Sequence, residues 1–73
     1  MATIKLTDEQ WLQQEADRVE SVLRQWLGGS EGRAGRNTAE LKARLEYVGL
    51  RYTAQELVEI RNKLAADGVI EVV

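Results

Sequence analysis

The expected fold is decided by one stretch of the chain, residues 37–73, NTAELKARLEYVGLRYTAQELVEIRNKLAADGVIEVV. It contains a helical pattern, a Gly-Leu turn at 49–50, a second helical pattern, a glycine at 68 and a short apolar segment. A glycine followed by an apolar residue is typical of a helix end, where the backbone turns left-handed and the apolar residue folds back. The stretch therefore predicts a helix-turn-helix unit that runs into a strand.

Three helix starts carry side-chain caps. A Thr or Asn followed three residues later by Gln or Glu can accept a hydrogen bond from the backbone N–H at that later position. This pattern begins at Thr7, Asn37 and Thr53. Together with the glycines at 28–29, 49 and 68, it predicts helices over residues 7–27, 38–48 and 54–67. Between the first two helices, residues 28–36 are rich in glycine and lack large apolar side chains, which predicts a flexible, mobile loop.

The two ends of the chain are expected to pair. Residues 69–73 are too apolar for a free tail, and Val and Ile favour strands. A lone strand would leave backbone groups without partners, and residues 3–6 form the other strand-like segment. The prediction is an α+β fold, a single domain over residues 1–73 with three helices and a small two-stranded sheet that joins the N- and C-terminal segments.

Composition excludes several classes of function. The chain has 73 residues, no Cys and no His, so the usual metal ligands, the thiol nucleophile and the commonest general base are absent. A chain this short offers little room for a catalytic cavity. We expect no enzyme activity, no cofactor and no metal. The sequence also has no signal peptide and no apolar run of the ~20 residues that a membrane helix needs, so we expect a soluble cytoplasmic protein.

The apolar and glycine positions over about residues 38–72 resemble those of the winged-helix and helix-turn-helix superfamily. The matching positions are Leu41, Leu45, Gly49, Tyr52, Thr53, Leu57, Leu64, Gly68 and Ile70. The resemblance implies that the third predicted helix lies in the DNA major groove while a hairpin wing touches the backbone. Residues 68–73 are too few for a full wing, so the wing is expected to be truncated or absent. The first predicted helix is also longer than is usual in that superfamily.

The resemblance favours duplex DNA as the partner. Gln55 and Asn62 lie opposite the apolar face of the third predicted helix, and their amides can read adenine edges. Basic side chains that could contact phosphates are Arg33, Arg36, Arg51, Arg61 and Lys63. Glu59 opposes this interpretation, because it lies on the same face. The formal net charge is −2, although residues 30–52 are locally basic.

The alternative is a protein-interaction or dimerisation adaptor that uses the first helix and the edge of the C-terminal strand. Trp11, Val22 and Trp26 lie on or beside the apolar stripe of that helix, and Trp is enriched at the energetic centres of protein interfaces. The same residues also fit a wide face buried within the domain. The sequence leaves DNA, a protein partner and a homodimer open.

Overall fold

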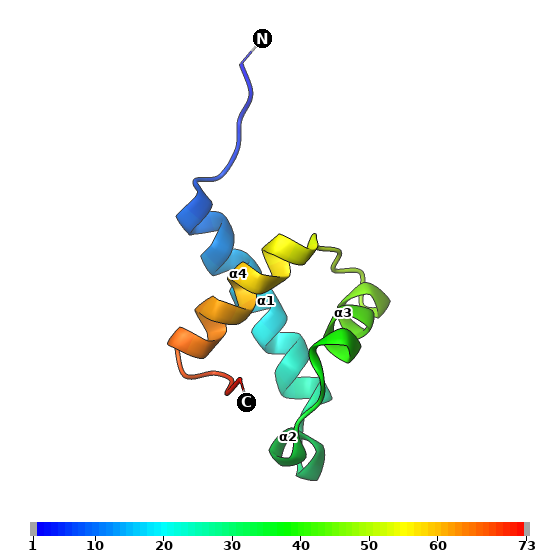
Figure 1. The fold of residues 1–73 in the computed structure, drawn as a ribbon. Helices are drawn as coiled ribbons and strands as arrows, with labels where there is room; N and C mark the ends of the chain where they lie inside the picture. The colour runs from blue at the N-terminus through cyan, green and yellow to red at the C-terminus, as the bar shows by residue number, and fades with distance from the viewer. Residues whose placement is uncertain (1, 73) are drawn as a thin grey trace.

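The computed structural model describes residues 2–72, which contain four helices and no strand (Figure 1). The helices are α1 (Asp8–Trp26), α2 (Ser30–Ala34), α3 (Thr38–Tyr47) and α4 (Ala54–Ala66). α4 lies across α1, α3 lies to one side of this pair, and the short α2 lies beyond the C-terminal end of α1 (Figure 1). None of the helices in this part of the chain is long and apolar enough to span a bilayer.

The predicted helix starts are confirmed. The Thr7 hydroxyl and the Asn37 side-chain oxygen each accept a hydrogen bond from the backbone N–H three residues later, at 3.2 and 2.9 Å. Thr53 forms the complete capping box with Glu56: the hydroxyl accepts from the Glu56 N–H at 3.1 Å, and the Glu56 carboxylate accepts from the Thr53 N–H at 2.8 Å. These bonds satisfy N–H groups that a helix start otherwise leaves without partners.

The two predicted glycine stops are also confirmed. At the end of α3 the Leu50 N–H donates to the Leu45 carbonyl at 2.8 Å, and at the end of α4 the Val69 N–H donates to the Leu64 carbonyl at 2.9 Å. These bonds define the Schellman motif. Gly49 has a φ of +90°, in the left-handed region that glycine adopts without a steric penalty.

The core lies where α4 crosses α1. Its fully buried side chains are Ala16, Val19, Leu23, Leu45, Ile60 and Leu64. Three of them come from α1 and two from α4, whereas α3 supplies Leu45. Burial of a Val, Leu or Ile side chain contributes about 1.5–3 kcal/mol, so most of the stabilisation comes from the α1–α4 contact. A half-buried apolar ring, which includes Leu12, Leu57 and Ile70, packs around this core.

The predicted α+β class is wrong, because the two terminal segments do not form a sheet. Residues 3–6 extend away from the helices, and Ile4 is 97% exposed. Residues 69–70 pack against the core instead. The two segments lie towards opposite ends of α1, whose 19 residues span about 28 Å, so they are too far apart to pair. Val73 of the predicted strand lies outside the described residues.

The predicted loop at 28–36 contains a helix, α2, that the sequence did not indicate. No side chain of α2 is buried. Its contact with α1 is a close approach of backbones: a Cβ added at Gly32 would lie 1.7 Å from the Leu27 carbonyl oxygen. Glycine at position 32 is therefore required for α2 to pack against the end of α1. Whether this segment is mobile stays a prediction.

Candidate functional site

The predicted DNA-reading residues share one exposed face of α4. Gln55 and Asn62 are both exposed, and seven residues at about 100° each bring them to nearly the same side of the helix. Ile60 and Leu64 are buried on the opposite side. The amides are therefore available to a ligand, in the arrangement that the sequence predicted.

The predicted phosphate-binding residues do not surround these amides. Arg61 and Lys63 lie on opposite edges of α4, since two residues turn the helix by about 200°. The Lys63 ammonium is paired with the Asp67 carboxylate at 3.3 Å. Arg51 is exposed in the connection between α3 and α4, whereas Arg33, Arg36 and Arg61 line a groove elsewhere. The structure thus divides the predicted basic set among separate surfaces.

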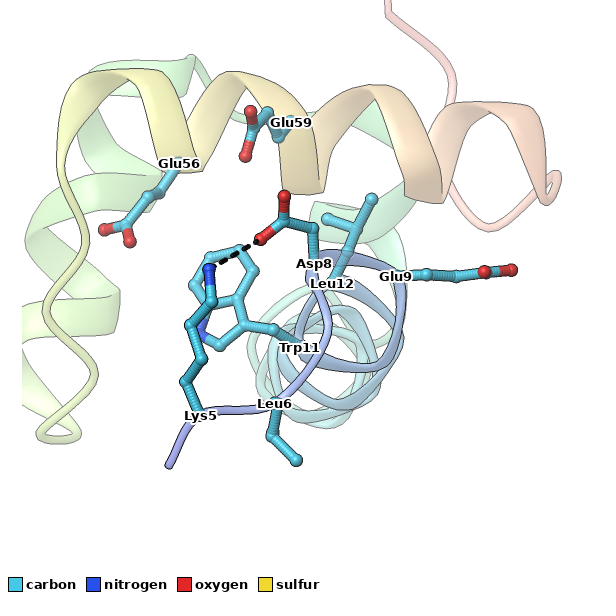
Figure 2. Close-up of a pocket in the computed structure, with 8 residues that line it drawn as sticks. All are labelled: Lys5, Leu6, Asp8, Glu9, Trp11, Leu12, Glu56 and Glu59. Carbon is cyan, nitrogen blue, oxygen red and sulfur yellow. Dashed lines mark ion pairs between the residues drawn. The ribbon is translucent and has the colours of Figure 1, made fainter. Parts of the chain in front are cut away.

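The N-terminal end of α1 and the first half of α4 enclose an acidic hollow of about 750 Å³ (Figure 2). Its lining residues, which we call the acidic end, are Lys5, Leu6, Asp8, Glu9, Trp11, Leu12, Glu56 and Glu59. The lining holds four carboxylates and one ammonium, and Lys5 is paired with Asp8 at 4.0 Å. Asp8 points toward α4, whereas Glu9 points away (Figure 2). Within residues 2–72 no three His, Cys, Asp or Glu side chains are grouped closely enough to hold a metal ion.

A buried polar contact closes this end of the molecule. The Tyr52 hydroxyl donates to the Glu15 carboxylate at 2.9 Å, and the Trp11 ring meets the Tyr52 ring edge to face at 6.4 Å. Arg18 lies 3.6 Å from the same carboxylate. Burial and the Glu15 hydrogen bond raise the pKa of Tyr52. This network ties the α3–α4 connection to α1. Sequence reasoning missed this network, whose one local signal is Glu15 among the apolar positions of α1.

A second groove, of about 890 Å³, lies at the other end of α1. It is bordered by the C-terminal part of α1, by α2, by the start of α3, by Arg61 of α4 and by residues 69–72. We call it the basic groove. Its apolar lining residues are Leu23, Trp26, Leu27, Leu41, Val69, Ile70 and Val72. Of these, Val72 is 57% exposed, so the groove presents apolar surface to solvent.

The charged lining of the basic groove is mostly cationic. It consists of Arg24, Arg33, Arg36, Arg61 and Glu71. Arg24 is paired with Glu20 at 3.0 Å, and Arg36 is paired with Glu31 at 2.9 Å. Hydrogen bonding to Glu31 raises the pKa of Arg36, whose guanidinium also lies over the Trp26 ring at 5.6 Å from its centroid. Arg36 thus holds the α2–α3 connection against the end of α1.

Two other arginines of the basic groove, Arg33 and Arg61, differ from Arg24 and Arg36. Neither Arg33 nor Arg61 forms an ion pair within the described part of the chain. Arg61 is half-buried, and its Nε is buried without a hydrogen-bond partner among these residues. A buried charged donor without a partner costs at least about 1–3 kcal/mol, a cost that a bound carboxylate can offset. The sequence placed Arg61 beside Gln55 and Asn62, and only the packing of α4 reveals that it lines this groove.

The predicted protein-interface residues do not form one surface. Trp11, Val22 and Trp26 are each half-buried and pack against the core. Trp11 lines the acidic end and Trp26 lines the basic groove. These two tryptophans are 15 positions apart in the sequence, which corresponds to about 22 Å along the helix. Any partner surface on α1 is therefore divided between its two ends.

No protein-family model, no curated protein and no solved structure matches this chain.

Proposed function

We propose that this domain is a non-catalytic protein-binding module that receives a partner segment in the basic groove. One observation carries the proposal: exposed apolar surface occurs in that groove together with two arginines that form no ion pair within residues 2–72. Protein interfaces combine an apolar centre with a polar rim, and Trp and Arg are enriched among their energetically dominant residues. Trp26, Arg33 and Arg61 supply these residue types in one place.

The charge distribution favours a protein over duplex DNA. A recognition helix must approach phosphates closely, yet the first half of α4 borders the four carboxylates of the acidic end. Repulsion between these groups and DNA would oppose binding, because phosphate contacts supply most of the affinity for nucleic acid. DNA binding remains the competing function, because Gln55 and Asn62 are exposed on one face of α4.

The test is a selection from a random-peptide display library against the folded domain. Enriched peptides are then added to the ¹⁵N-labelled protein. We expect chemical-shift changes at Trp26, Leu41 and Val72, and loss of binding in Val72→Asp. Val58→Asp is the matched control, because Val58 is an exposed valine on α4 at 44% exposure, outside the basic groove.

A parallel titration with mixed-sequence duplex DNA at low salt tests the competing function. Two results together would overturn the proposal in favour of DNA. DNA would cause shifts at Gln55 and Asn62 that Val58→Asp removes, and the library would contain no peptide whose binding depends on the groove. Loss of peptide binding in both valine variants would indicate a non-specific apolar interaction and would also overturn it.

A further inference from the structure

We infer that the occupant of the basic groove is the segment at residues 2–9 of a second copy of this chain, so that two copies associate reciprocally. This inference rests on the proposed function and adds the identity of the partner. It follows from an exposed apolar segment without a partner, from the opposite charges of the two ends of α1, and from the short reach of the segment within one molecule.

The segment offers apolar side chains that the described residues of its own molecule leave exposed or partly exposed. Residues 2–6 are extended and exposed. Ile4 is 97% exposed and Leu6 is 43% exposed. Large apolar side chains in an extended segment are a common means of recognition, in which alternate side chains enter an apolar groove. The basic groove offers Trp26, Leu41 and Val72 as the complementary surface.

The charges at the two ends of α1 are complementary. The acidic end holds four carboxylates and one ammonium, whereas the basic groove holds one carboxylate and four guanidinium groups, of which Arg24 and Arg36 are already ion-paired within the molecule. Asp8 and Glu9 directly follow the apolar segment. A segment whose Ile4 lies on the apolar floor would thus bring carboxylates toward Arg33 and Arg61, which lack ion pairs within the described residues. Such complementarity orients a complex and speeds association.

The segment cannot reach the groove of its own molecule. Leu23 is the first α1 residue of the groove and lies about 22 Å along the helix from Asp8. Ile4 is four residues before Asp8, so an extended backbone carries it at most ~14 Å from that end, and the segment leaves α1 in the opposite direction (Figure 1). If two copies lie with their α1 helices antiparallel, each acidic end lies beside the other copy's basic groove. The two contacts are then equivalent, and the association closes as a symmetric dimer.

Sedimentation of the full chain over a range of concentrations tests the inference. We expect a monomer–dimer equilibrium that weakens as salt is raised, because the contact is partly ionic. Ile4→Ser and Arg33→Gln should each weaken dimerisation at least 10-fold without loss of helix content, since both side chains are exposed. Tyr47→Ser is the matched control: Tyr47 is 80% exposed and lines neither the acidic end nor the basic groove.

A synthetic peptide of residues 2–10, added to ¹⁵N-labelled Ile4→Ser protein, locates the contact. We expect shifts in the basic groove, and none with a peptide that carries Ser at positions 4 and 6. A purely monomeric chain at millimolar concentration, or a dimer that Ile4→Ser leaves intact, overturns the inference. If the chain is monomeric but library peptides bind its groove, only this inference is overturned. If the groove binds neither library peptides nor the 2–10 peptide, the proposed function is overturned as well.

Discussion

The two ends of α1 carry the same kind of residue in opposite settings. Trp11 lies against Tyr52 at the acidic end, and Trp26 lies under Arg36 at the basic groove. Because α4 lies across α1, both ends of α1 extend beyond the crossing (Figure 1). Beside the acidic end, a hydrogen bond from Tyr52 to Glu15 links the α3–α4 connection to α1. The basic groove instead holds two arginines that form no ion pair within the described residues.

The difference shows how a small domain can separate stability from binding. At the acidic end, Tyr52 and Glu15 satisfy each other inside the structure. At the basic groove, Arg61 lacks such a partner among the described residues and Val72 is largely exposed. Surface of this kind stabilises nothing until a partner covers it. The following predictions test this comparison, from the largest expected effect to the smallest.

The largest effect is expected for Leu45→Ala. Leu45 is the buried side chain through which α3 packs against α1 and α4. Its truncation should therefore also displace the start of α3, which borders the basic groove. Leu45 is 1% exposed, and such a truncation costs about 2–5 kcal/mol. A domain of this size has a total stability of about 4–11 kcal/mol, so much or all of the cooperative unfolding transition should be lost. Urea titration followed by circular dichroism measures this. Tyr47→Ala, in the same helix but 80% exposed, should change the free energy of unfolding by less than about 0.5 kcal/mol.

A smaller effect is expected for Tyr52→Phe at the acidic end. The substitution leaves the buried Glu15 carboxylate without its 2.9 Å donor, at a cost of about 1–3 kcal/mol in the free energy of unfolding. Combined with Glu15→Gln, it should show a coupling energy in a double-mutant cycle, while binding in the basic groove stays unchanged. If the losses in unfolding free energy from the two single substitutions simply add in the double variant, the hydrogen bond between Tyr52 and Glu15 does not contribute to stability.

The same hydroxyl predicts a pH dependence. Burial and Glu15 raise the pKa of Tyr52 above its ordinary value of about 10, so the folded state holds the proton more tightly than the unfolded state. The resulting stability is fully present below about pH 10 and is lost as the pH rises through the folded-state pKa. The difference in unfolding free energy between wild type and Tyr52→Phe should therefore shrink above about pH 10. A difference that grows there would contradict the assignment.

The smallest effect on stability is expected for Gly32→Ala at the basic groove. The new Cβ would meet the Leu27 carbonyl at 1.7 Å, so α2 must move, yet α2 buries no side chain. We expect a loss of less than about 1 kcal/mol, with amide shifts concentrated around α2 and the basic groove. Gly28→Ala is the matched control, since its Cβ would make ordinary contacts at 3.7 Å. Equal shifts in both variants would contradict the close approach.

The sequence by itself determined where α1, α3 and α4 start and end, although it did not indicate α2. The caps at Thr7, Asn37 and Thr53, and the stops at Gly49 and Gly68, depend on hydrogen bonds between residues at most five apart. Such bonds join residues that are close in the sequence, so short sequence patterns are enough to predict them. The helix bounds predicted from them agree with the observed ones within a residue.

Only the tertiary structure decided what each segment contacts. The apolar pattern of residues 69–72 fits a strand or a packed irregular segment equally well, and the crossing of α4 over α1 placed it against the core rather than beside residues 3–6. The same packing placed Arg61 in one groove with Arg33, and it brought Tyr52 to Glu15 across 37 positions. Long-range contacts depend on the packing of whole helices, which no local pattern encodes.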